Sequence, residues 1–137
     1  KLIKMHNKKI SEIIKDLNTK KYSCYEMISH FINRIKKMNK KINGFISISE
    51  EDSIEQAKNI DKNYKKHHNK TIYGIPYAQK DILCTKKIKT TCASKMLYNF
   101  FPNYNSTVEQ KLYNKNTIKQ AKDRSIEGNY SAFILFK

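Results

Sequence analysis

Apolar residues near the start of the chain recur every three or four positions, the spacing that places them on one face of a helix. The first such face consists of Ile10, Ile13, Ile14 and Leu17. The repeat stops over residues 18–21, and a second one then begins. Its apolar positions are Met27, Ile28, Phe31, Ile32, Ile35 and Met38. Two consecutive amphipathic segments with a short connection predict an antiparallel helical hairpin.

Two serines mark the starts of helices. The hydroxyl of Ser23 is placed to accept a hydrogen bond from the backbone N–H of Glu26, while the Glu26 carboxylate can accept one from the N–H of Ser23. This reciprocal arrangement is a capping box, so we expect the second helix to begin here. A third helix is predicted after Ser49, because the acidic residues 50–52 that follow are stabilised near a helix N-terminus.

Short apolar runs between the helices predict strands. The run 45–48 follows Gly44 and is rich in β-branched residues, and a second strand is predicted over 72–81. An irregular segment follows through Lys89.

A last helix is predicted after Asn105 or Ser106, with Val108 and Leu112 on its buried side. The resulting order of helix, helix, strand, helix, strand and helix is typical of the opening of an α/β fold.

The charge of the chain does not by itself identify a partner. A net charge of +16 would suit a nucleic-acid surface, because basic side chains neutralise phosphates. Only Arg34 and Arg124 are arginines, however. Lysine lacks the planar guanidinium group, which forms paired hydrogen bonds with a base or a phosphate. The lysines are also spread along the chain among many Asn, Ile and Tyr residues, so we favour compositional bias over a nucleic-acid patch. A small basic module that binds RNA or a partner protein stays open as the alternative.

Cysteine and histidine usage indicates neither a disulfide framework nor a metal site. Cys24, Cys84 and Cys92 are odd in number and lack the spacing of zinc ligands, and His67 and His68 would point to different faces of a helix. No apolar run approaches the length of a membrane span or of a secretory signal. We therefore expect a cytoplasmic chain that has no contact with a membrane.

Lys80 is the lysine whose surroundings suggest chemistry. It ends a mostly uncharged run that includes Ile75, Tyr77 and Ala78. A lysine that such neighbours dehydrate has a lowered pKa, which lets the amine accept a proton near neutral pH. Asp81 need not pair with it, because adjacent residues of a strand point to opposite faces. The pattern alone favours the plainer interpretation, in which Lys80 is an edge-strand lysine that reaches water.

The segment around Lys80 also resembles a known family. Residues 74–81, Gly-Ile-Pro-Tyr-Ala-Gln-Lys-Asp, are similar to the GIP-x-A-x-KD motif of the amidase signature family. Residues 84–86 and 89–97 resemble one branch of it, the A-type subunits of the glutamyl-tRNA(Gln)/aspartyl-tRNA(Asn) amidotransferases. Further similar segments are 20–26, 41–46 and 104–108. The resemblance runs from about residue 8 to about residue 118.

This resemblance implies an incomplete α/β fold. We expect an N-terminal helical hairpin followed by the first strands and helices of an amidase-signature mixed sheet. Residues 1–118 would be the N-terminal part of that domain. Residues 119–137 depart from the family pattern and are expected to form a divergent tail that is not native to the fold, as a truncated or frame-disrupted subunit would have.

The resemblance further implies a reaction. Members of the family use a triad of a serine, a cis-serine and a lysine, and Lys80 matches the lysine. Glutamine would be the substrate that releases ammonia, and other amidotransferase subunits would pass that ammonia to a misacylated tRNA. ATP and magnesium would be used by the partner subunit, so no cofactor is expected in this chain.

The chain departs from the family at several positions. It has three glycines and no Gly-Ser-Ser cluster, so neither serine of the triad is assigned, and the chain alone is expected to be inactive. Gln79 stands where the family has an apolar residue, and it needs a polar partner if it is buried. Lys87 and Ala93 stand where the family has glycine, so each is expected to be strained if its φ is positive.

Overall fold

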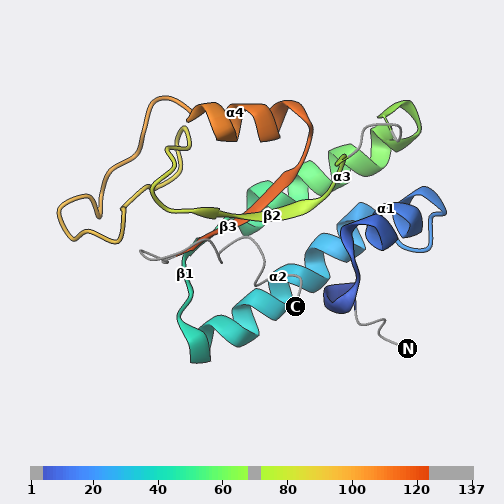
Figure 1. Cartoon of the computed structure of the whole chain (residues 1–137), viewed down its shortest axis with the longest axis horizontal. Helices are drawn as coiled ribbons and strands as arrows, with labels where there is room; N and C mark the ends of the chain where they lie inside the picture. Colours follow the sequence, from blue (N-terminus) through green and yellow to red (C-terminus); the bar gives the residue numbers. More distant parts are fainter. Residues whose placement is uncertain (1–4, 68–71, 124–137) are drawn as a thin grey trace.

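The computed structural model describes residues 5–67 and 72–123. Its elements in chain order are a short 3-10 helix η1 (Met5–Asn7), α1 (Ile10–Asn18), α2 (Cys24–Ile42), β1 (Phe45–Ile48), α3 (Glu50–His67), β2 (Pro76–Lys80), α4 (Thr107–Asn114) and β3 (Ile118–Asp123). Figure 1 shows α4 on one side of the strands and α1 and α2 on the other. None of the helices in these residues is long and apolar enough to cross a membrane.

The three strands form a mixed sheet in the order β1-β3-β2. β3 runs antiparallel to β1 and parallel to β2, with Ala121 opposite both Ile48 and Ala78. The mixed α/β architecture predicted from the sequence is therefore confirmed.

β3 itself was not predicted. The expected tail begins at residue 119, yet residues 119–123 continue the strand from Ile118 and lie between β1 and β2. The side chains of Lys119, Gln120 and Lys122 are buried there. The residues of β3 do not alternate between apolar and polar, so the sequence contains no pattern that would predict a central strand here. The rest of the expected tail, from residue 124 onward, lies outside the described residues.

The N-terminus of α2 is capped from two directions. The predicted capping box is confirmed: Ser23 Oγ accepts from the N–H of Glu26 at 3.0 Å, and the Glu26 carboxylate accepts from the N–H of Ser23 at 2.8 Å. Asp61 on α3 accepts from the N–H groups of Cys24 and Tyr25 at 2.7 and 2.9 Å. Because these N–H groups have no partner within the helix, the carboxylate of Asp61 also attaches α3 to the start of α2.

The main hydrophobic core lies along α2. Its predicted apolar stripe is buried from Met27 to Ile35, and Ile13 and Leu17 of α1 join the same core. The two helices predicted to form the N-terminal hairpin are present and joined by a short connection, and α2 packs more extensively against α3 than against α1.

α4 begins where predicted but buries a different face. Ser106 caps it, accepting from the N–H of Glu109 at 3.3 Å. The prediction that Val108 lies on the buried side is wrong, because its side chain is 50% exposed. Glu109 is buried instead, since a lysine of β3 and the hydroxyl of Tyr77 both bind its carboxylate. A buried carboxylate of this kind cannot be inferred from hydrophobic periodicity.

Candidate active site

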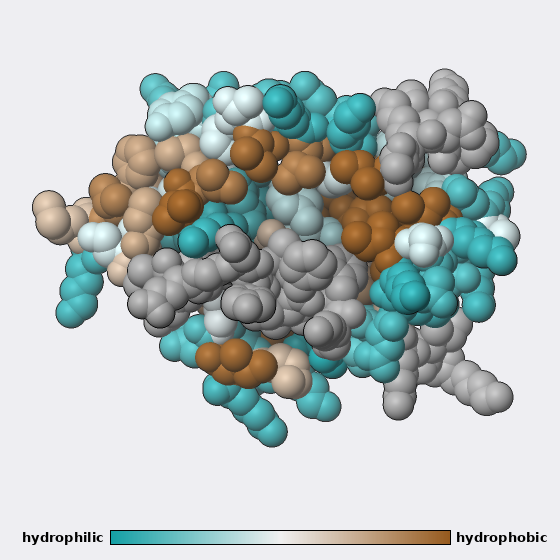
Figure 2. Space-filling model, in the orientation of Figure 1, coloured by the Kyte–Doolittle hydropathy of each residue, from teal (hydrophilic) through white to brown (hydrophobic). Residues whose placement is uncertain are grey.

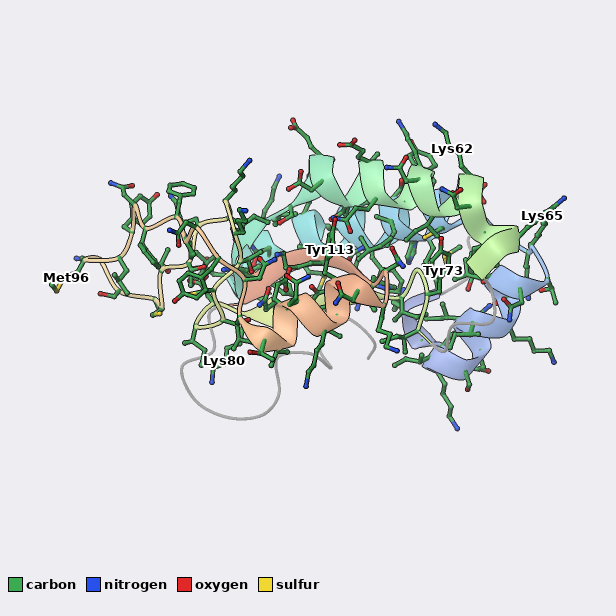
Figure 3. All side chains as sticks on the ribbon, turned by 90° about the horizontal axis from the view of Figure 1, so that it is seen from above. Lys62, Lys65, Tyr73, Lys80, Met96 and Tyr113 are labelled. Carbon is green, nitrogen blue, oxygen red and sulfur yellow. The ribbon has the colours of Figure 1, made fainter. Side chains whose placement is uncertain are left out.

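Lys80 occupies the C-terminal end of β2, which is an outer strand of the described sheet. Its side chain is half-buried, and it makes no hydrogen bond or ion pair with any residue that the structure describes. Figure 3 shows Lys80 at the margin of the molecule, on the side away from α3. Its apolar neighbours Ile75 and Ala78 are buried as expected. The geometry thus provides an amine that is accessible and has no counter-ion among these residues, while its role as a base stays a prediction.

Asp81 does not pair with Lys80, as expected, although it lies in the turn directly after β2 and not in the strand itself. The carboxylate is buried and accepts hydrogen bonds from the backbone N–H and the hydroxyl of Thr91, at 2.9 and 2.6 Å. Its other oxygen lies 3.6 Å from Nζ of Lys122 on β3. Asp81 therefore fixes the segment that follows Lys80 and does not act as a counter-ion to Lys80.

Lys122 is a fully buried lysine at the centre of this arrangement, and no pattern in the sequence indicated it. Its ammonium donates to the backbone carbonyl of Leu83 at 3.2 Å and to the hydroxyl of Thr90. Burial lowers the pKa of Lys122, and the nearby Asp81 carboxylate acts in the opposite direction. Through these contacts Lys122 joins the central strand to both ends of the segment 83–90.

Gln79 finds the polar partners that its burial requires. Its side-chain oxygen accepts from the hydroxyl of Thr85 at 3.0 Å, and its side-chain nitrogen donates to the carbonyl of Leu83 at 3.4 Å. The expectation that this polar replacement needs a partner is confirmed, and the partner comes from the turn directly after the strand.

The two suspected glycine replacements do adopt the left-handed conformation. The φ of Lys87 is 62° and that of Ala93 is 53°. An L-residue in this region costs about 1–2 kcal/mol, because its Cβ approaches the following carbonyl oxygen. The segment beyond Lys80 therefore contains backbone strain at the two positions that the sequence indicated.

Four serines of the chain, Ser94, Ser106, Ser125 and Ser131, follow the Lys80 motif, and none of them was assigned to the triad. Two of them have local structural roles. Ser106 caps α4, and the hydroxyl of Ser94 accepts from the N–H of Met96 at 3.2 Å. Ser125 and Ser131 lie outside the described residues. Neither Ser94 nor Ser106 forms a hydrogen bond with Lys80.

Comparison with known sequences gives a consistent result. The family described as Amidase matches residues 26–127. The A-type subunit of glutamyl-tRNA(Gln) amidotransferase from Coxiella burnetii is 49% identical over 108 residues, which are 79% of this chain and 22% of that protein. The protein of the same name from Nitrosococcus oceani is 41% identical over 108 residues, which again are 79% of this chain and 22% of that protein. The chain thus spans about a fifth of the length of the curated relatives that it matches.

Solved structures show the same fold at lower identity. An amidase family protein from Bacillus anthracis superposes on 87% of this chain and 24% of its own, with a TM-score of 0.82 and 22% identity. Fatty acid amide hydrolase superposes on 93% of this chain and 24% of its own, with a TM-score of 0.78 and 16% identity.

The strain at Lys87 predicts a stabilising substitution. Glycine tolerates a positive φ, so Lys87→Gly should raise the free energy of unfolding by up to about 1 kcal/mol. Lys86→Gly is the matched control, since Lys86 is also an exposed lysine but has no positive φ. It should lower the free energy of unfolding by about 0.5–1 kcal/mol. Urea unfolding followed by circular dichroism measures both, and an equal loss in the two variants would contradict the strain at Lys87.

The buried pair of Asp81 and Lys122 predicts a large loss on removal of the carboxylate. Asp81→Ala leaves a buried ammonium without its anion and should lower the free energy of unfolding by about 3–5 kcal/mol. The control is Glu50→Gln, which breaks an exposed pair with Lys36 at 2.5 Å and should cost at most about 1 kcal/mol. The same urea titration compares the two variants. If Asp81→Ala unfolds at the same urea concentration as Glu50→Gln, the buried pair does not form.

Proposed function

This chain belongs to the amidase family, and we propose that it supplies the proton-accepting lysine of a glutaminase that serves a tRNA-dependent amidotransferase. The observation that carries the proposal is its high identity to proteins named as the A-type subunit of glutamyl-tRNA(Gln) amidotransferase. The family match includes the motif of residues 74–81 with Lys80 near its end. The product of the complex would be Gln-tRNA(Gln), or Asn-tRNA(Asn) if aspartyl-tRNA is the acceptor.

In the proposed reaction Lys80 acts at the end of a proton relay. The nucleophilic serine gives its proton to the cis-serine, which gives its own to the uncharged amine of Lys80, while the nucleophile attacks the amide carbon of glutamine. The proton then returns to the departing nitrogen, which leaves as ammonia. Water hydrolyses the acyl-enzyme to glutamate and restores the serine. The place of Lys80 in the matched motif supports this role, and no carboxylate among the described residues pairs with its amine.

The remaining parts of the reaction would come from outside these 137 residues. The chain matches about a fifth of its curated relatives, and the serines of the triad would lie in the part of the domain that it does not match. Other amidotransferase subunits would receive the ammonia and use it on the misacylated tRNA. The ATP and magnesium of that step would bind to the partner subunit.

A chimera tests whether Lys80 is a working base. Residues 26–118 of this chain would replace the matching segment of the Coxiella burnetii protein, and ammonia release from glutamine would be measured in the assembled complex. The chimera should be active, and Lys80→Met should lower its rate by about 10²–10⁴-fold, the usual contribution of a general base.

Lys111→Met serves as the control, because Lys111 is an exposed lysine outside all the segments that resemble the family, and its loss should leave the rate unchanged. Circular dichroism of the purified chimeras would establish that they fold alike. Ammonia release that survives Lys80→Met, or a folded chimera without activity, would contradict the proposal.

A further inference from the structure

A cavity of about 380 Å³ lies between α3 and α4, away from Lys80. Its floor includes Lys119 of β3 and Tyr77 of β2, and one wall carries Glu109 of α4. Tyr113, which Figure 3 labels between the two helices, also lines it. Cavities of this size are typical of sites for small molecules.

The floor of the cavity contains hydrogen-bond donors without acceptors among the described residues. Lys119 is 6% exposed, and its ammonium donates to Oε1 of Glu109 at 2.9 Å. The other carboxylate oxygen of Glu109 accepts from the hydroxyl of Tyr77 at 2.8 Å. An ammonium has three N–H donors, and Glu109 is the one acceptor for Lys119 among residues 5–67 and 72–123. Two donors of a buried cation therefore remain available to a ligand, and burial lowers the pKa of Lys119 because the charge is poorly solvated.

The charges around the cavity indicate the sign and size of that ligand. Lys86 and Lys87 stand exposed at its mouth, and Asp52 lies exposed on the α3 side. Three lysines against the carboxylates of Asp52 and Glu109 leave an excess of one positive charge. A singly charged anion balances this set, whereas a doubly charged phosphate would face repulsion from two nearby carboxylates.

We propose that the cavity between α3 and α4 binds a small monocarboxylate, whose oxygens accept the free N–H donors of Lys119. Lys86 and Lys87 attract the anion to the mouth, and Glu109 limits the affinity because it shares the same ammonium. The site does not include Lys80 and is independent of the proposed glutaminase reaction.

The test is an NMR titration of the ¹⁵N-labelled chain of 137 residues with sodium acetate and, separately, inorganic phosphate, at constant ionic strength. Acetate should shift the amide signals of Tyr77, Glu109 and Lys119 to saturation in the millimolar range. Lys119→Met keeps the apolar stem and should abolish the saturating shifts. Lys111→Met is the matched control, because Lys111 is exposed on α4 outside the cavity, and it should bind acetate as the unchanged chain does.

A second variant covers the case in which Lys119→Met fails to fold. Glu109→Gln removes the competing negative charge while keeping a side chain of the same shape, so acetate should bind about tenfold more tightly. Acetate shifts that do not saturate, or that are equal in Glu109→Gln and the unchanged chain, would overturn the proposal. Saturation by phosphate without saturation by acetate would overturn the assignment to a carboxylate.

Discussion

The burial of Lys122 beside Asp81 is the interaction on which the arrangement around Lys80 depends. It joins the central strand to the segment that leaves β2, through the Asp81 carboxylate and two further acceptors. A buried ion pair stabilises a fold only when its geometry offsets the cost of removing both charges from water. Here the compensation is partial, because Oδ1 of Asp81 accepts no hydrogen bond within the described residues. The same strand buries Gln120 with an oxygen that has no partner there. We infer that β3 is the centre of the sheet and that the hydrogen bonding of its buried polar side chains is incomplete.

Much of the fold could be predicted because its causes are local. The capping box at Ser23 and the cap at Ser106 act within one helical turn, and the stripe of α2 repeats at the helical period. β3 could not be predicted, since a strand that buries lysines contradicts the pattern by which strands are recognised. The burial of Glu109 was not predicted either, because it depends on a lysine ten residues further along the chain. Val108, chosen for its apolar side chain, is exposed instead. Apolar segments around 96–104 likewise remain on the surface at the end of the molecule seen in Figure 2.

In the candidate site, too, the features with local causes could be predicted and those that depend on distant residues could not. The motif identified Lys80 and the family, and the departures at Gln79, Lys87 and Ala93 were found by comparing single positions with that motif. Their consequences in the structure follow from backbone conformation and from a partner within six residues. One support of the segment 81–92 comes from β3, however, and no pattern in the sequence links Lys122 to Asp81. The solved relatives share this fold at 16–22% identity, so the fold tolerates wide changes in the side chains that hold it.

Hydrogen exchange of the backbone amides in β3 tests the central claim most directly. A strand that lies between two others donates most of its amides to hydrogen bonds, so the hydrogen-bonded amides of residues 119–122 should exchange only when the whole chain unfolds. Their protection, measured by NMR, should equal that of Ile28 and Phe31 in the core of α2. Exchange at the rate of an unstructured peptide in residues 119–122, with α2 still protected, would show that β3 does not hold the sheet.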